Sequence, residues 1–265
     1  MPNYKFAAFS DTHLPILNRK SWEKTAAVID AHEPDVIVHL GDLLEGKRGS
    51  RHVQDERHGW DAVAEIEAAR KFIEEMNERF PYAHKVWLWG NHDANFLTYV
   101  PGHQTKEDAR THRALFDSVC GPLLKSWRVI DRYNTDTSWY LGQVCFRHGY
   151  STSPAGIRKE IIQHVPQYGL LVMGHTHRPQ AVTQLEWGGT ITPWWHCNTG
   201  HHAREDDMHY MNRMDRGNWG SGVLIGEARA QGLKEGRRFA ATPQWSAELV
   251  IHGRNSIHHH DVGFR

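Results

Sequence analysis

The sequence predicts an α/β fold in which parallel βαβ units come first and a strand-rich half follows. Up to Gly90, short runs of apolar and often β-branched residues alternate with amphipathic helical segments. After Pro122, short strand patterns predominate. Strand–helix–strand units within one sheet have right-handed crossovers in nearly all cases, so the alternating first half implies a parallel sheet.

Three strands and two helices are predicted in the first half. The first helix covers residues 21–31, with Ser21 as its N-cap. The second helix covers residues 60–80 and has one apolar face. That face consists of Val63, Ile66, Ala69, Phe72, Ile73 and Met76. The strands are apolar runs followed by Gly or polar residues, and they cover residues 4–9, 35–40 and 85–89.

The second half contains two further helices, over residues 105–119 and 156–165. Gly188-Gly189 lies between two strand patterns and predicts a hairpin. Residues 47–58 are polar and predict a loop. The predicted strands of this half cover residues 127–130, 139–141, 144–147, 169–173, 182–187, 190–196, 222–227 and 245–251.

The composition excludes several classes of protein. The chain has 31 Lys and Arg and 31 Asp and Glu, so it has no global basic field with which to hold nucleic acid. No apolar run approaches the roughly 18 residues of a membrane-spanning helix, so no membrane partner is expected. The N-terminus lacks a signal-peptide pattern. Three widely spaced Cys residues predict neither a disulfide framework nor a zinc knuckle, which fits a reducing cytoplasm.

We expect a single domain over residues 1–265, because no linker divides the chain and the length is ordinary for one large α/β domain. Residues 199–220 are polar and Met-rich, and they are long for a connection without periodicity. This segment is therefore predicted to be a lid or a substrate-binding loop. Residues 252–265, which include His258 to His260, are predicted to be a solvated tail.

Five predicted strands end in residues that can bind a metal ion. In open α/β sheets, ligands bind beyond the carboxyl ends of the strands, so residues far apart in sequence would meet at one rim. A glycine before several of these residues lets the chain turn sharply as it leaves the strand. The five motifs are Asp11-Thr12-His13, Gly41-Asp42, Gly90-Asn91-His92-Asp93, His148-Gly149 and Gly174-His175-Thr176-His177.

These residue types indicate a site for divalent metal ions. Taken singly, each is equally well explained as a turn residue or a surface histidine, and their joint placement is what favours a site. Imidazoles, carboxylates and an amide oxygen suit Mn, Fe, Zn, Ni or Co. Alternate residues of an extended segment point to opposite sides, so a His-x-His or Asp-x-His segment that binds through both ends must curl. The candidates exceed what one ion needs, and two ions roughly 3.5–4 Å apart that share a carboxylate account for them.

The five motifs, in this order, resemble those of the calcineurin-like metallophosphoesterases. The resemblance covers Asp11 to His177 and, more weakly, extends to Gly200. It implies a four-layer α/β/β/α sandwich of two mixed sheets flanked by helices. It also implies two divalent metal ions, with Mn favoured, which are bridged by Asp42. The remaining implied ligands are Asp11, His13 and His177 for one ion, and Asn91, His148 and His175 for the other.

The same resemblance implies metal-dependent hydrolysis of a phosphoester. A hydroxide between the two ions would be the nucleophile. His92 resembles the general acid of the family, and Asp93 would orient its ring. No P-loop, H-E-x-x-H or G-x-S-x-G motif occurs, so a P-loop ATPase, a zincin protease and a serine hydrolase are not expected.

The substrate is predicted from four arginines near the expected rim. Arg48 and Arg51 lie in the loop after Asp42, and Arg204 and Arg213 lie in the 199–220 segment. A solvated loop and a plain lid are the alternatives for these two segments. We favour a phosphodiesterase that acts on nucleic acid or nucleotides. A phosphomonoesterase, such as a protein phosphatase, is the alternative enzyme, and a non-catalytic scaffold of the same fold is the alternative from another class.

Overall fold

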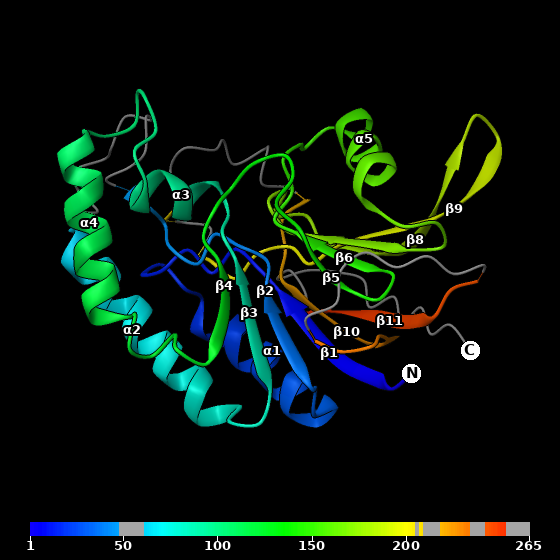
Figure 1. Ribbon diagram of the computed structural model, residues 1–265, viewed down its shortest axis with the longest axis horizontal. Helices are drawn as coiled ribbons and strands as arrows, with labels where there is room; N and C mark the ends of the chain where they lie inside the picture. The colour runs from blue at the N-terminus through cyan, green and yellow to red at the C-terminus, as the bar shows by residue number, and fades with distance from the viewer. Residues whose placement is uncertain (48–60, 205–206, 209–217, 234–241, 253–265) are drawn as a thin grey trace.

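Two mixed β-sheets lie face to face in the computed structural model of the protein, with helices on their outer faces (Figure 1). The structure describes residues 1–47, 61–204, 207–208, 218–233 and 242–252. The first sheet has the strand order β11 (Trp245–Ile251), β10 (Gly222–Arg229), β1 (Asn3–Phe9), β2 (Val36–His39), β3 (His84–Leu88) and β4 (Trp127–Ile130). The second has the order β5 (Trp139–Leu141), β6 (Val144–Arg147), β7 (Leu170–Met173), β9 (Thr190–Asn198) and β8 (Gln180–Trp187).

In both sheets, the strands that precede the site motifs run parallel to one another. Antiparallel strands are added at one edge of the first sheet and at both edges of the second. Strands β1 to β4 run parallel, whereas β10 and β11 are antiparallel additions beside β1. In the second sheet, β6, β7 and β9 run parallel, with β5 and β8 antiparallel at the two edges. The predicted α/β class and parallel first half are therefore confirmed.

Alternation along the strands produces the layers. In β1, Phe6 and Ala8 are buried in the apolar cluster between the two sheets, while Phe9 is buried against the helices. In β6, Phe146 faces the cluster between the sheets, whereas Cys145 faces the other side. Each sheet thus buries both faces, which gives the four-layer α/β/β/α sandwich that the resemblance implied.

Five helices accompany the sheets in the described part of the chain. Helices α1 (Arg19–His32), α2 (Ala62–Arg79) and α4 (Lys106–Val119) contribute to the cluster that covers the first sheet. Helix α5 (Pro154–His164) packs on the second sheet through Ile161. The short helix α3 (Asn91–Leu97) begins directly after β3, at the rim where the parallel strands end (Figure 1).

Three details of the predicted helices are wrong. Helix α1 begins two residues before Ser21, and its N-cap is Asn18, whose side chain accepts a hydrogen bond from the Ser21 N–H at 3.2 Å. Val63 was placed on the apolar face of α2, but it lies in the first turn of the helix and is 60% exposed. Helix α3 was not predicted, because its first residues are those of the Gly90 motif, which indicated a loop.

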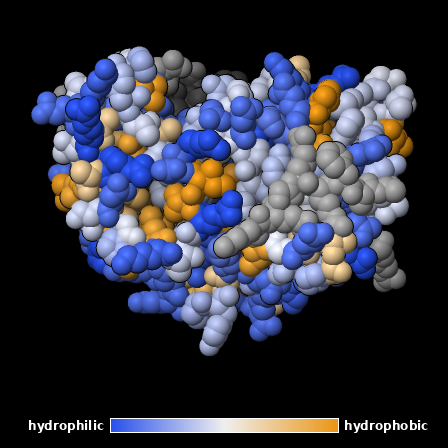
Figure 2. Space-filling model, viewed as in Figure 1, coloured by the Kyte–Doolittle hydropathy of each residue, from blue (hydrophilic) through white to orange (hydrophobic). Residues whose placement is uncertain are grey.

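The face of the molecule shown in Figure 2 is mainly hydrophilic. On the face shown in Figure 2, apolar residues form small groups separated by hydrophilic ones. Among the described residues, no helix has both the length and the apolar character needed to cross a membrane. The tail predicted over 252–265 and the loop predicted over 47–58 lie outside the described residues, apart from His252 and Lys47.

Candidate metal centre

The five motifs meet at one rim, where the carboxyl ends of β1, β2, β3, β6 and β7 come together. The Asp11 N–H donates to the carbonyl oxygen of Gly41 at 2.9 Å, which joins the loops after β1 and β2. The His148 ring donates from Nδ1 to the carbonyl oxygen of Leu40 at 3.1 Å, and this bond connects the second sheet to the first. The predicted convergence of distant strand ends is therefore present.

Three overlapping groups of side chains present their ligand atoms within 4.8 Å of one another. His13 belongs to the first two groups and Asp42 to the last two, so the groups form one continuous array. The groups are Asp11, His13 and His177; His13, Asp42 and His92; and Asp42, His148 and His175.

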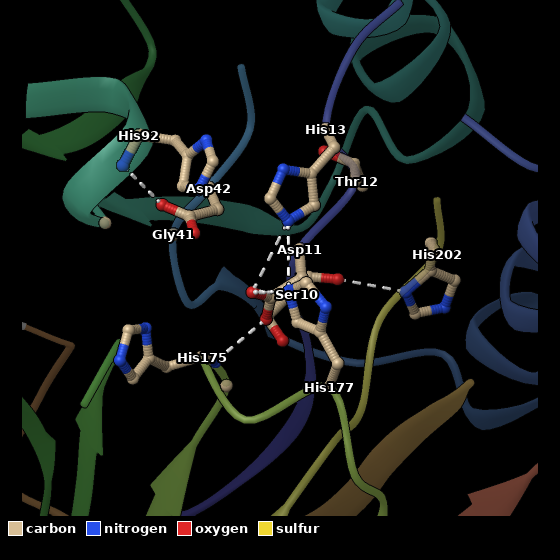
Figure 3. A network of polar contacts seen from close by, with 12 residues as sticks. Ser10, Asp11, Thr12, His13, Gly41, Asp42, His92, His175, His177 and His202 are labelled. Atoms are coloured by element: carbon tan, nitrogen blue, oxygen red, sulfur yellow. Dashed lines mark hydrogen bonds and ion pairs between the residues drawn. The ribbon is translucent and has the colours of Figure 1, made fainter. Parts of the chain in front are cut away.

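In the first group, two imidazoles converge on one carboxylate (Figure 3). The Nε2 atoms of His13 and His177 are 3.1 Å apart. Oδ1 of Asp11 lies 3.1 Å from Nε2 of His177 and 3.8 Å from Nε2 of His13. Three donor atoms thus surround one point, which is the arrangement expected of ligands that share an ion.

The side chain of Asn91 lies beside the last group, next to His148. Nε2 of His148 lies 3.2 Å from Oδ2 of Asp42 and 3.1 Å from Oδ1 of Asn91. The ring of His175 lies with its centroid 5.0 Å from that of His148. All seven predicted ligands are therefore at the rim, and Asp42 lies between the groups, as the predicted bridging role requires.

The backbone curls, as predicted, in the two motifs whose ligands are separated by one residue. Among the described residues, seven non-glycine residues have positive φ. Five of these are predicted ligands: Asp11, His13, Asp42, His175 and His177, with φ between 46° and 67°. Left-handed backbone costs such residues on the order of 1 kcal/mol each and is retained where function needs it. The strain turns both ends of Asp11-Thr12-His13 and of His175-Thr176-His177 to the same side.

Two glycines leave room for the carboxylates rather than only allowing a turn. A Cβ on Gly90 would lie 2.1 Å from Oδ1 of Asp42, and a Cβ on Gly174 would lie 2.4 Å from Oδ2 of Asp11. Any side chain at these positions would displace a predicted ligand. Gly41, in contrast, has a φ of 116° and does make the predicted sharp turn.

The site concentrates buried charge that needs compensation. Asp11, His13, Asp42 and His148 are at most 1% exposed. Burial alone would raise the pKa of Asp11, but hydrogen bonds with His13 and His177 outweigh it and hold that pKa well below the usual range. Burial would lower the pKa of His148, but the neighbouring Asp42 carboxylate raises it to about 9. Buried carboxylates thus demand positive charge at this rim, which fits divalent cations.

Polar contacts at the second ring nitrogen orient two predicted ligands, through a hydrogen bond for His148 and an ion-pair contact for His13. His148 donates from Nδ1 to Leu40, so its Nε2 faces Asp42. Nδ1 of His13 lies 2.8 Å from Oε2 of Glu45, so its Nε2 faces Asp11 and His177. Glu45 is a site residue that the sequence reasoning missed. The available signal was an acidic residue in the same loop as Asp42, three residues further on.

The predicted contact between Asp93 and the His92 ring is wrong. The Asp93 carboxylate is buried and accepts the backbone N–H groups of Asp42, Leu44 and Gly90, each at 2.9 Å. Burial, together with the Asp42 charge, raises its pKa to about 7. The His92 ring instead donates from Nδ1 to the carbonyl oxygen of Glu45. Asp93 therefore shapes the loop after β2, and Glu45 orients His92.

His92, Asn91 and His175 form the more open side of the array. All three are half-buried, while the other predicted ligands are buried. The backbone N–H of His92 donates to Oδ1 of Asp42 at 2.9 Å, which leaves the side chain of His92 beside Asp42 and His13 (Figure 3). A substrate can approach the array from this side.

The described ends of the 199–220 segment pack against the site, and residues 205–206 and 209–217 of this predicted lid or substrate-binding loop lie outside the described residues. The ring of His201 stacks on His177 with centroids 5.0 Å apart, and Trp219 meets His177 edge-on at 4.4 Å. His202 donates from Nδ1 to the carbonyl oxygen of Ser10 at 3.0 Å. The sequence reasoning missed His201 and His202. The signal was that they follow β9, which runs parallel to β7 and ends at the same rim.

The structure describes one of the four predicted substrate arginines. Arg204 is exposed and ion-paired with Asp207. Arg48, Arg51 and Arg213 lie outside the described residues.

Comparison with known proteins identifies the family. A family model of calcineurin-like phosphoesterases matches residues 4–179, which include all seven predicted ligands. The chain belongs to the calcineurin-like phosphoesterase family. This family implies metal-dependent phosphoester hydrolysis and divalent metal ions, and the buried array of imidazoles and carboxylates fits such ions.

Other comparisons add little to the family assignment. No curated protein matches the chain. A solved structure described as the crystal structure of Pseudomonas putida nuclease MPE is similar to this calcineurin-like chain, with a TM-score of 0.36 and 12% identity. The match covers 83% of this chain and 84% of the nuclease chain.

Proposed function

We propose that this protein is a phosphodiesterase that uses two divalent metal ions at the rim, with Mn as the favoured ion and Fe, Zn, Ni or Co as alternatives. The observation that carries this proposal is the continuous array of three metal-binding groups connected through His13 and Asp42. One isolated group would suit a single ion. Groups that share members suit two neighbouring ions and a bridging ligand.

We assign each predicted ligand to one of the two ions. Asp11, His13 and His177 would hold one ion, and Asn91, His148 and His175 the other, with Asp42 between them. When bound, the ions supply Lewis-acid charge and a nucleophilic water at neutral pH. Glu45 holds the ring of His13 through Nδ1 and that of His92 through its carbonyl oxygen, so both rings are oriented before substrate arrives.

His92 is assigned to the leaving group. Its ring is anchored at Nδ1 by Glu45, which leaves Nε2 as the atom that can hold a proton for the departing oxygen. The residue lies on the more open side of the array, where a bound phosphoester would meet it. The phosphoester would thus lie between the ions and His92.

The charge around the array favours a diester over a monoester. A phosphomonoester carries about two negative charges at neutral pH, whereas a diester carries one. Two arginines that flank the site are already neutralised: Arg147, beside His148, is 1% exposed and pairs with Glu160 at 3.1 Å, and Arg204 pairs with Asp207. Neither of these two described arginines is free to add positive charge for a dianion, which supports the monoanionic diester.

The test is a substrate comparison on protein that has been treated with a chelator and reloaded with single metals. With Mn²⁺, we expect kcat/KM for bis(p-nitrophenyl) phosphate to exceed that for p-nitrophenyl phosphate by roughly tenfold or more, which corresponds to about 1.4 kcal/mol. Labelled single-stranded DNA serves as a second diester. Faster hydrolysis of the monoester would identify a phosphomonoesterase. Hydrolysis of neither ester with any metal would leave only the non-catalytic scaffold.

A further inference from the structure

An exposed aromatic ring lies next to the metal array and takes no part in holding it. Tyr150 is 52% exposed, although it follows His148 by only two residues. Its ring stacks on Tyr133 with centroids 5.3 Å apart and an interplanar angle of 23°. Tyr133 in turn meets the His148 ring edge-on, with centroids 5.7 Å apart. The two tyrosines therefore extend outward from a predicted metal ligand as a stacked pair.

The pair is held rigidly. The backbone N–H groups of Tyr150 and Ser151 both donate to Oε1 of Glu160 at 2.9 Å. The other oxygen of that carboxylate pairs with the buried Arg147 at 3.1 Å. The Tyr133 hydroxyl donates to the carbonyl oxygen of Gly149 at 3.0 Å, so the segment after β4 is tied to the segment after β6 (Figure 1). The backbone of Tyr150 and the ring behind it are thus fixed, so little conformational entropy is lost when a ligand stacks on the pair.

We propose that Tyr150, backed by Tyr133, is a subsite that stacks a planar aromatic group of the phosphodiester, a nucleobase, while its phosphate lies at the array. This proposal rests on the proposed function and names the substrate class of that site. One face of Tyr150 is covered by Tyr133, and the half-exposed ring offers its other side to a ligand. Stacking of a base on an aromatic side chain contributes about 1–3 kcal/mol and requires no sequence-specific hydrogen bonds.

A purely structural role would need only Tyr133. That ring is half-buried, contacts His148 and makes the hydrogen bond to Gly149. The outer ring of Tyr150 adds no polar contact to the array. Its exposed half keeps apolar surface in contact with water, which is unfavourable. A subsite explains why a large ring is placed there, whereas support of His148 does not.

The test uses two substrates that differ only in the base. Thymidine 5′-(methyl phosphate) carries a base, and 1,2-dideoxyribose 5′-(methyl phosphate) has the same sugar and leaving group without any aromatic ring. We expect the wild-type protein to have a lower KM for the thymidine ester by roughly 5- to 150-fold, the ratio that corresponds to the stacking energy. Tyr150→Ala should remove this difference and leave the KM of the base-free ester unchanged. Tyr150→Phe should retain it.

Tyr82→Ala is the matched control, because Tyr82 is 100% exposed and precedes β3, at the end of that strand opposite the array. It should keep the difference between the two esters. Equal KM values in the wild-type protein, a difference that persists in Tyr150→Ala, or an equal loss on both esters would overturn the subsite. Hydrolysis of the base-free ester without a base preference refutes only the subsite. Hydrolysis of neither ester refutes the proposed function and, with it, the subsite.

Discussion

Asp42→Asn is expected to abolish phosphoester hydrolysis and to lower the metal content from two ions per chain towards one or none. Asp42 belongs to two of the three metal-binding groups, and the first of these two shares His13 with the remaining group. An amide has one oxygen and no charge, so it cannot bridge two cations as a carboxylate does. The loss should therefore affect every substrate and every metal.

Asp42→Asn should change metal binding without disturbing the fold. Asn tolerates the left-handed backbone of this position, where φ is 54°. Its carbonyl oxygen can also still accept the His92 N–H, which now lies 2.9 Å from Oδ1. Metal content is measured by elemental analysis, with the same substitution at the exposed Asp136 as the control. Two full equivalents of metal in Asp42→Asn would remove Asp42 from the bridge.

His92→Ala should lower kcat by roughly 10²–10⁴-fold, the usual contribution of a general acid, while both metal ions and phosphate binding are retained. The size of the loss should depend on the leaving group. A p-nitrophenolate leaves without a proton and should suffer least, whereas an alkoxide needs the proton and should suffer most. The comparison requires one aryl and one alkyl phosphodiester, assayed with the same metal.

Metal analysis of His92→Ala decides between two roles that the geometry permits. His92 lies with His13 and Asp42 within ligand distance, and the His13 and His92 ring centroids are 4.8 Å apart. Loss of a metal ion would make His92 a ligand instead of an acid. An equal loss of rate on both leaving groups would mean that it stabilises charge on the phosphoryl oxygens without donating a proton.

The strand ends were predictable because two local signals coincide there. Apolar runs with β-branched residues identify buried strands, and Asp, Asn or His after such a run, often beside a Gly, identifies the point where a strand ends. Parallel topology then brings Asp11, Asp42 and His148 to one rim without any knowledge of side-chain contacts. The four layers were implied by the family resemblance and not by the strand patterns. Alternation along β6 indicates two buried faces but does not show which element covers each.

Contacts between loops were not predictable. Glu45 acts through a contact of its carboxylate with His13 and of its backbone with His92, and neither contact has a sequence period. The family resemblance assigned Asp93 to the His92 ring, but helix α3 turns its carboxylate towards the backbone of the loop after β2. Trp219 contacts His177 although more than 40 residues separate the two in the sequence.

The central claim is that two metal ions act together at the rim, and a metal titration of the wild-type protein tests it most directly. Chelator-treated protein is titrated with Mn²⁺ while bound metal and hydrolysis of bis(p-nitrophenyl) phosphate are followed in the same samples. The account predicts no activity without metal and a rate that reaches its plateau at two bound ions per chain. A full rate in metal-free protein, or a plateau at one ion that further Mn²⁺ does not change, would contradict it.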